Sequence, residues 1–136
     1  MIYVTRREVF SASHRIYNSK LSDEQNFQIY GKCSNPNGHG HNYILEVVVK
    51  GEIDNETGYL LDLKILKKII HENVIDKLDH KNLNIDVDFM NGIIPTSENI
   101  TLAIWKQLEN KIPNGELYSV KLYETENNYV EYKGEQ

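Results

Sequence analysis

The chain has 136 residues, of which 40% are hydrophobic and 26% are charged, and its formal net charge is −5. A chain of this length predicts one domain, spanning residues 1–136. The acidic balance argues against a nucleic-acid-binding protein, because a phosphate backbone would repel it. It still allows a local basic pocket that takes a phosphorylated small molecule.

The single cysteine, Cys33, cannot form an intrachain disulfide, and a free thiol is typical of a reducing compartment. Charged residues follow Met1 too closely for the apolar region of a signal peptide. No apolar run approaches the roughly 20 residues of a membrane span. These features predict a cytoplasmic protein that does not enter a membrane.

Periodicity of the apolar residues predicts four strands and two main helices. The strands are expected over residues 2–12, 42–53, 117–125 and 129–132. The helices are expected over residues 62–77 and 95–110, with an irregular loop over 85–94. The resulting order ββααββ predicts an α+β fold in which a four-stranded antiparallel sheet carries both helices on one face. Such a sheet has two exposed edges, which edge-to-edge oligomerisation would cover.

Two smaller features complete the predicted elements. Ser22 and Gln25 have the spacing of a capping box, which predicts a short helix that Phe27, Ile29 and Tyr30 pack down. His71 lies in the middle of the first main helix, where we expect it to be a surface residue.

The segment of residues 33–41 concentrates one thiol and two imidazoles in nine residues. If His39 and His41 open the following strand, they point to the same face of the sheet. His14, at the end of the first strand, is the candidate for a third ligand. Three histidines with no fixed fourth protein ligand are typical of a catalytic zinc site, although imidazoles also suit other transition metals. The alternative is a Gly-, Asn- and Pro-rich turn with surface histidines.

Cys33 has three interpretations that the sequence leaves open. It is a buried inert thiol, a fourth zinc ligand that closes the site, or a reactive thiolate beside the metal.

Four other polar residues are candidate site residues, each with a structural alternative. Asp79 and His80 follow the first helix and form either an acid/base pair or an ordinary polar helix end. Glu98 lies in the first turn of the second helix, which Thr96 or Ser97 would cap. A carboxylate at Glu124 is either solvent-facing or able to accept paired hydrogen bonds from a guanidine-like heterocycle.

Several motifs together resemble the 6-pyruvoyl-tetrahydropterin synthase family over nearly the whole chain. They are Phe10-Ser11-Ala12-Ser13-His14-Arg15, the segment of residues 33–41, Leu78-Asp79-His80-Lys81-Asn82-Leu83, Thr96-Ser97-Glu98-Asn99 and Tyr123-Glu124-Thr125. The resemblance implies the ββααββ tunnelling fold (T-fold). It also implies trimers that close a twelve-stranded barrel and stack into a homohexamer.

The same resemblance implies the role of each site residue. The implied ligands of Zn²⁺ are His14, His39 and His41. Cys33 is the implied general base, activated by Asp79 and His80 that come in part from a different subunit. Glu124 anchors the pterin ring, with Thr96 and Glu98 near it, and Arg15, Lys20 and Lys81 are triphosphate-binding candidates by charge.

The implied reaction converts 7,8-dihydroneopterin triphosphate to 6-pyruvoyl-tetrahydropterin and releases triphosphate. A sister enzyme of queuosine biosynthesis, 6-carboxy-5,6,7,8-tetrahydropterin synthase, takes the same substrate but also releases acetaldehyde. Three residues typically separate its cysteine from the histidine pair, whereas here five residues separate Cys33 from His39, as in the pyruvoyl enzyme. A third alternative, from a different class, is a non-catalytic zinc-binding protein with Cys33 as fourth ligand.

Overall fold

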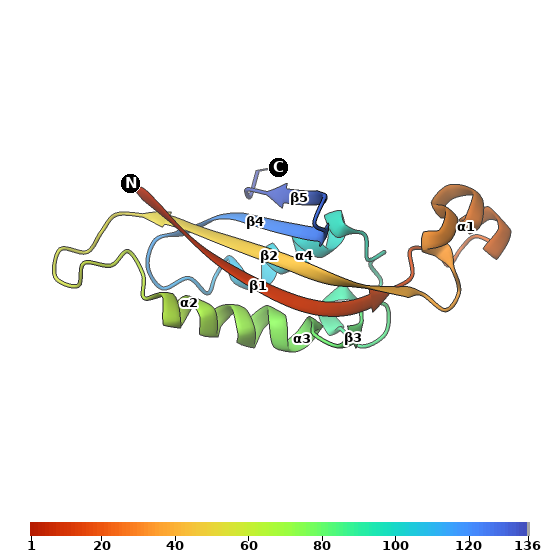
Figure 1. Ribbon diagram of the computed structural model, residues 1–136, viewed down its shortest axis with the longest axis horizontal. Helices are drawn as coiled ribbons and strands as arrows, with labels where there is room; N and C mark the ends of the chain where they lie inside the picture. The colour runs from red at the N-terminus through yellow and green to blue at the C-terminus, as the bar shows by residue number, and fades with distance from the viewer. Residues whose placement is uncertain (136) are drawn as a thin grey trace.

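A five-stranded sheet forms the centre of the computed structural model, which describes residues 1–135 (Figure 1). Its strand order is β3-β1-β2-β4-β5. The strands are β1 (Ile2–His14), β2 (His39–Gly51), β3 (Lys81–Asn82), β4 (Glu116–Thr125) and β5 (Asn128–Tyr132). Strands β1, β2, β4 and β5 pair antiparallel, and β3 adds a short parallel pairing to β1. The prediction of a four-stranded antiparallel sheet is therefore wrong in one respect, since it missed β3. A strand of two residues is too short to leave a β pattern in the sequence.

Strands β1 and β2 form a long hairpin whose pairing continues past the predicted ends. The register joins Ala12 to His41 and His14 to His39. The sequence predicted an earlier end for β1 and a later start for β2, because serine, glycine and histidine are weak β-formers. Pairing between the strands overrides that propensity and brings all three histidines into the sheet.

One helical stretch and one separate helix cover a single face of this sheet (Figure 1). The stretch comprises α2 (Leu63–Ile70), a π-helical turn (His71–Ile75) and α3 (Asp76–Leu78). Helix α4 (Ser97–Leu108) packs on β4 and β5. Both predicted main helices are present, but nothing in the sequence indicated the π turn. A short 3₁₀ helix, η3 (Asp88–Met90), lies in the loop between them.

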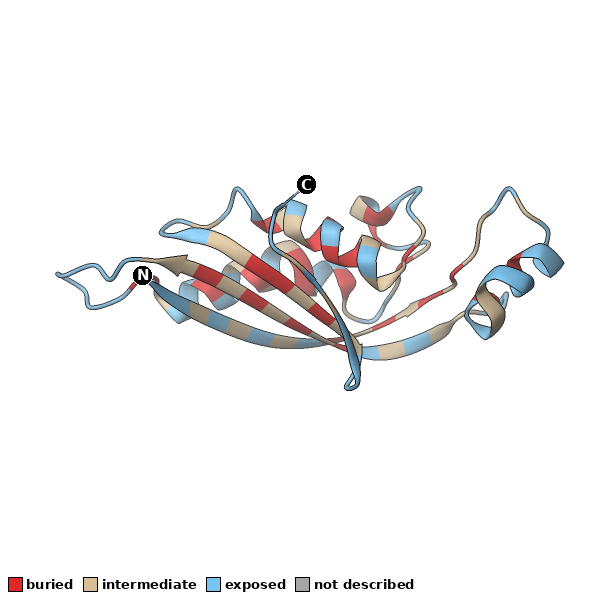
Figure 2. Cartoon of the chain, turned by 90° about the horizontal axis from the view of Figure 1, so that it is seen from above, coloured by how far each residue is buried: buried red, intermediate tan, exposed pale blue. Residues whose placement is uncertain are grey.

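The core lies between the sheet and the helices, where Figure 2 shows the buried residues in alternating bands along the strands. Tyr43, Leu45, Val47 and Val49 alternate along β2 and are fully buried. They face helix side chains that are also fully buried, including Leu66, Ile70, Ile100 and Ile104. Because side chains alternate between the two faces of a strand, burial of these four residues determines which face of the sheet each remaining residue of β2 occupies.

The connection between β1 and β2 folds as a separate projection, the 15–38 segment. It contains α1 (Asp23–Tyr30) and the 3₁₀ helix η1 (Gly31–Ser34), and Figures 1 and 2 show it beyond the end of the sheet. The capping box of Ser22 and Gln25 is present as predicted. The predicted packing of Phe27 and Ile29 is wrong, because they are 61% and 62% exposed on a helix that does not lie over the core.

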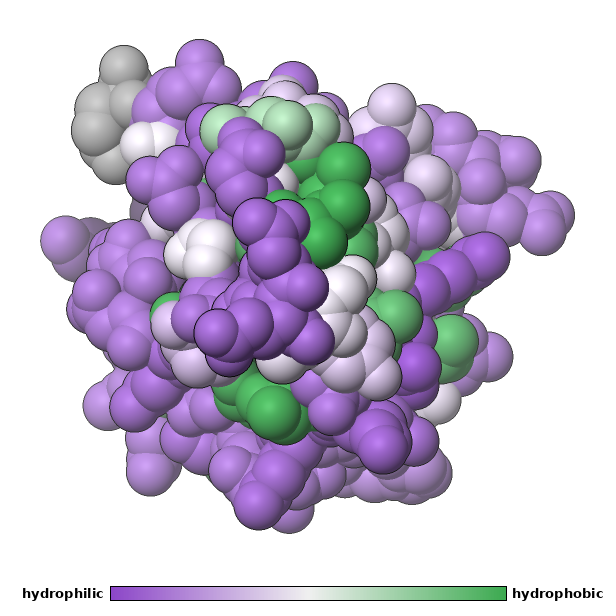
Figure 3. Space-filling model, turned by 90° about the vertical axis from the view of Figure 1, so that its left-hand side faces the viewer, coloured by the Kyte–Doolittle hydropathy of each residue, from purple (hydrophilic) through white to green (hydrophobic). Residues whose placement is uncertain are grey.

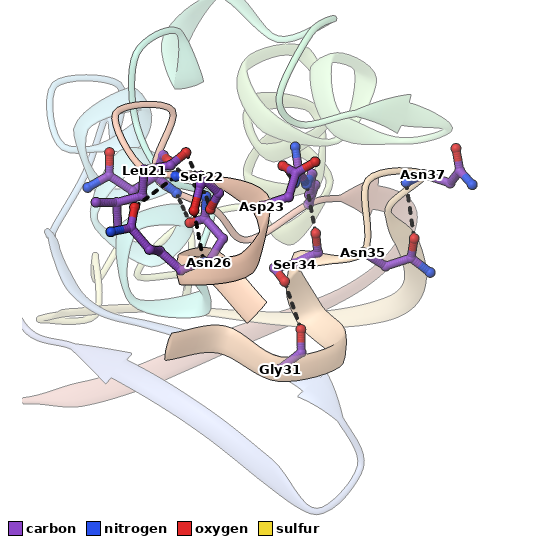
Figure 4. A network of polar contacts seen from close by, with 11 residues as sticks. Leu21, Ser22, Asp23, Asn26, Gly31, Ser34, Asn35 and Asn37 are labelled. Atoms are coloured by element: carbon purple, nitrogen blue, oxygen red, sulfur yellow. Dashed lines mark hydrogen bonds and ion pairs between the residues drawn. The ribbon is translucent and has the colours of Figure 1, made fainter. Parts of the chain in front are cut away.

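Polar contacts hold the 15–38 segment together instead (Figure 4). The Asn26 side chain is 1% exposed. Its Oδ1 accepts a hydrogen bond from the Asn18 backbone, and its Nδ2 donates to the carbonyls of Asn18 and Ser22. A buried amide satisfied in this way takes the place of an apolar anchor.

The opposite end of the molecule carries a small hydrophobic patch among hydrophilic side chains (Figure 3). A hollow there is lined in part by Ile53, Tyr59, Ile65 and Pro113. It lies beyond Gly51, at the end of β2 away from the histidines. Within residues 1–135, no helix has the length and apolar character needed to cross a membrane.

Candidate metal centre and active site

The three histidines predicted as metal ligands come together at the end of the β1–β2 hairpin. One nitrogen from each of His14, His39 and His41 lies within 4.8 Å of the corresponding atoms of the other two. His14 and His39 are directly opposed in the antiparallel register, and His41 is two residues further along the same face. Ligand nitrogens of a four-coordinate zinc ion lie roughly 3.3 Å apart, given Zn–N bonds of about 2.0–2.1 Å. The spacing therefore fits one shared metal ion.

The His14 imidazole is oriented by groups outside the cluster. Its Nδ1 lies 2.8 Å from the Pro95 carbonyl oxygen, to which it donates, and 3.4 Å from the Tyr43 hydroxyl. This bond assigns the proton to Nδ1 and leaves a lone pair on Nε2, which faces His39 Nε2 at 3.1 Å. Burial lowers the pKa of His14, which is 1% exposed, and so favours the neutral form that binds metals.

His41 supplies the clearest sign that this cluster fits a metal ion. Its Nε2 is the one buried side-chain polar atom without a hydrogen-bond partner within residues 1–135. Glu124 Oε1 lies 3.2 Å away, but the pair lacks hydrogen-bond geometry. Burial lowers the pKa of His41 even though the Glu124 carboxylate opposes that shift. Buried polar atoms rarely lack partners, so a metal ligand bond is the natural role of this lone pair.

Gly38 allows the two strands to meet at the cluster. Its φ of +74° lies in the region that favours glycine, and a Cβ there would lie 2.9 Å from the His14 carbonyl oxygen. A side chain at this position would push His39 away from His14.

Cys33 is exposed on η1 and is not a member of the histidine group. Within residues 1–135 its thiol has no hydrogen-bond partner. The buried inert thiol is therefore wrong for this chain, since the side chain reaches solvent. The geometry of the cluster also gives no support to Cys33 as fourth ligand.

Asp79 and His80 form a bonded pair at the end of α3. Asp79 Oδ2 lies 3.0 Å from His80 Nδ1, and Asp79 Oδ1 accepts a hydrogen bond of 2.9 Å from the Ser11 backbone. The Ser11 amide, with help from His80, lowers the pKa of Asp79. His80 adopts a φ of +61°, the one non-glycine residue with positive φ in the part of the chain described, and its side chain is 83% exposed. Such strain concentrates at functional sites.

Glu124 lies on β4 next to the histidines, with a helix residue on its other side. Its Oε2 accepts a hydrogen bond of 2.6 Å from the Ser97 hydroxyl. Glu98, Ser97 and Glu124 line one cavity of about 210 Å³. Thr96 is not part of that lining; its hydroxyl caps α4 by accepting a hydrogen bond from the Asn99 backbone.

Three contacts differ from the sequence reading or were missed by it. The hydroxyl of Ser97 and the carbonyl of Pro95 hold site residues, and only their position beside Thr96 and Glu98 could have drawn attention to them. His71, expected as a surface residue, lies with its Nε2 2.7 Å from Glu8 Oε1 and joins the π-helical turn to β1. Of the three triphosphate candidates, Lys20 and Lys81 are exposed, whereas Arg15 is already bonded within the chain.

Comparisons with known proteins agree with this arrangement. The family model described as 6-pyruvoyl tetrahydropterin synthase matches residues 3–135. The 6-pyruvoyl tetrahydrobiopterin synthase of Pongo abelii is 54% identical over 97% of this chain and 91% of its own length. That of Dictyostelium discoideum is 52% identical over 98% of this chain and 97% of its own length. The structure of Caenorhabditis elegans 6-pyruvoyl tetrahydropterin synthase superposes with a TM-score of 0.92 at 41% identity, covering 98% of this chain and 96% of that one. The chain therefore belongs to the 6-pyruvoyl tetrahydropterin synthase family.

Proposed function

We propose that this chain converts 7,8-dihydroneopterin triphosphate to 6-pyruvoyl-tetrahydropterin and releases triphosphate, with zinc held by His14, His39 and His41. The observation that carries the proposal is the histidine cluster, in which the buried His41 Nε2 makes no hydrogen bond within residues 1–135 and lies beside Glu124. When bound there, zinc would supply Lewis-acid polarisation of the oxygens on the substrate side chain. The remaining steps belong to residues of the protein itself.

Glu124 is suited to bind the pterin ring. A carboxylate presents two acceptor oxygens, and the pterin ring offers adjacent amino and amide N–H donors. Ser97 donates to Oε2 and so fixes the orientation of the carboxylate. The Glu98 side chain lines the same cavity and is placed to contact the ring. Thr96 contributes by capping the helix that carries both Ser97 and Glu98.

Cys33 is the proposed general base. An exposed thiol can reach substrate, and its thiolate form would take a proton from the carbon that carries a side-chain hydroxyl. Asp79 orients His80 through the 3.0 Å contact, and an imidazole held in this way can accept the proton of a thiol. No hydrogen bond within residues 1–135 joins Cys33 to either residue. We therefore infer that Cys33 meets an Asp79–His80 pair of a neighbouring copy.

Open strand edges support such an assembly. β3 covers only Ala12 and Ser13 of β1, and β5 is the other edge of the sheet. Unpaired edges favour pairing with another chain. We propose a homohexamer of two stacked trimers, each closing a barrel of twelve antiparallel strands. The free thiol of Cys33 is typical of a reducing compartment, and we therefore propose that the enzyme is cytoplasmic.

Product identity tests the proposed function. The zinc-loaded protein is incubated with 7,8-dihydroneopterin triphosphate, and the pterin is identified by mass spectrometry with and without sepiapterin reductase to trap the pyruvoyl product. We expect pyruvoyl product and triphosphate without acetaldehyde. A 6-carboxy product with acetaldehyde would move the chain to the queuosine branch and show that the cysteine–histidine spacing does not decide the chemistry. No turnover by an oligomeric, metal-replete sample would instead favour a non-catalytic zinc protein.

A further inference from the structure

The residue after the metal ligand His14 is held on both sides of its backbone. Asn84 Oδ1 accepts a hydrogen bond of 2.7 Å from the Arg15 amide, and Asn84 Nδ2 donates one of 2.9 Å to the Arg15 carbonyl. The Leu83 amide also donates to the Ser13 carbonyl at 2.8 Å. The Asn84 side chain therefore continues the β3–β1 pairing by imitating a strand neighbour, and fixes the path of the chain where β1 ends.

The Arg15 side chain turns toward the segment that carries Cys33. Its Nε donates to the Ser34 carbonyl at 2.8 Å, and its Nη2 lies 3.0 Å from Asp23 Oδ1. Figure 4 shows Ser34 and Asp23 close together in this network, and the guanidinium stacks 4.0 Å from the Tyr17 ring centroid. Only 18% of the Arg15 side chain is exposed. A planar guanidinium fixed by three contacts serves to hold two segments of the chain together and is not free to bind phosphate.

A second bond ties Cys33 itself to the same stretch of backbone. The Ile16 amide donates to the Cys33 carbonyl at 2.9 Å. Ser34 is 3% exposed, and its hydroxyl closes the 3₁₀ turn by donating to the Gly31 carbonyl at 2.8 Å. The carbonyls of Cys33 and Ser34 are thus both held from residues 15 and 16, directly after His14. These bonds set the position of the thiol relative to the metal ligands.

We propose that Arg15 and Asn84 are positioning residues for the reaction, which act by fixing Cys33 relative to the histidine cluster. The proposal rests on the proposed role of Cys33 as base, and it replaces triphosphate binding as the role of Arg15. Misplacing a reacting group by about 1 Å can lower a rate roughly 100-fold. Loosening this network should therefore lower kcat while leaving substrate binding and the metal in place.

The test compares Arg15→Lys with the matched variant Arg7→Lys, since Arg7 is exposed on β1 and has no polar side-chain contact within residues 1–135. Lysine keeps the charge but cannot reach Ser34 and Asp23 in one plane. We expect R15K to lower kcat about 10- to 100-fold with KM within about twofold and unchanged zinc content. N84A should lower kcat in the same direction. R7K should keep kcat within about twofold, because the exposed Arg7 side chain takes no part in this network.

Two further measurements separate positioning from other roles. In a Cys33→Ala background, R15K should cause no additional loss, because Arg15 acts through Cys33. The Ile16 amide should exchange its hydrogen faster in R15K than in R7K, a result that does not depend on turnover. An equal loss of kcat in the Cys33→Ala background, or unchanged exchange at Ile16, would overturn the proposal. A raised KM with unchanged kcat would assign Arg15 to triphosphate instead. If Cys33→Ala keeps full activity, the proposed base fails, and hydrogen exchange still reports whether Arg15 holds the turn.

Discussion

The sheet–helix core and the 15–38 segment are built on different physical principles, although each contributes residues to the proposed site. The core buries alternating apolar side chains of β2 against helices, and the register that this burial fixes aligns His39 with His14. The 15–38 segment exposes its apolar Phe27 and Ile29 and depends on hydrogen bonds centred on Asn26 and Arg15. The candidate metal ligands therefore lie on the rigid core, whereas the position of the Cys33 thiol depends on a polar network.

This difference separates the residues that stabilise the fold from those that set the position of the Cys33 thiol. Apolar burial stabilises by about 25 cal/mol per Å², so most folding free energy comes from the core. Individual hydrogen bonds contribute only about 1 kcal/mol net, yet they define position sharply. Changes in the core should appear in unfolding, and changes in the 15–38 segment should appear in kcat.

The largest expected effect comes from His39→Ala, at the point where the two regions meet. Removing one of the three proposed ligands leaves two imidazoles, which is too few for a catalytic zinc site. We expect zinc content measured by elemental analysis to fall to background and turnover to vanish with it. His71→Ala is the control. Because His71 lies outside the cluster, the H71A protein should keep its zinc. Turnover by a metal-free H39A would contradict the assignment.

A pair of isoleucines separates the core from the 15–38 segment. Ile104 is fully buried and Ile29 is 62% exposed. Ile104→Ala should lower the free energy of unfolding by about 2–5 kcal/mol because it opens a cavity. Ile29→Ala should change it by less than about 0.5 kcal/mol. Urea denaturation of both variants measures this, and equal losses would mean that α1 packs on apolar surface after all.

Asn26→Ala tests the polar hub directly. It removes the acceptor of the Asn18 amide and the side-chain donor to the Asn18 and Ser22 carbonyls, and an unsatisfied buried group costs about 1–3 kcal/mol. We expect local hydrogen exchange in residues 18–26 to accelerate while amides of β2 keep their protection. If exchange rises uniformly across the sheet, the 15–38 segment is not the separate unit described above.

Glu8→Gln probes the polar exception inside the core layer, and its effect is the smallest. Burial raises the pKa of Glu8, but the contacts with Arg6 and His71 outweigh it and leave the pKa below its usual range. A lowered folded pKa stabilises the protein above the unfolded pKa, and that contribution disappears as the pH falls through the folded value. The free energy of unfolding of the wild type should exceed that of E8Q by roughly 1 kcal/mol at pH 7. This advantage should shrink below about pH 4.3, and a pH-independent difference in urea denaturation would contradict it.

Much of the core could be read from the sequence, because its periodic apolar residues determine both strands and helices. The helix at residues 62–77 and the β2 alternation are examples of this strong signal. The π turn at residues 71–75 and the two-residue β3 were missed, since neither leaves a pattern in composition or spacing.

The site was predictable only where chemistry and strand spacing coincide. His39 and His41 share a face because they are two residues apart, which the sequence states directly. The contacts that orient His14 and Arg15 do not follow any local pattern. The Pro95 carbonyl reaches His14 across 81 positions of the chain, and Asn84 reaches Arg15 across 69. Such contacts depend on tertiary packing, so the network around Cys33 emerged only in three dimensions.

The most direct test of this account measures zinc content, Tm and turnover together in Cys33→Ala. A thiol that serves as base and not as ligand predicts retained zinc and an unchanged Tm. Turnover should fall by about 10²- to 10⁴-fold, the usual contribution of general-base catalysis. Lost zinc would show that Cys33 closes a structural metal site, and full turnover with zinc retained would show that the proton is taken by another group.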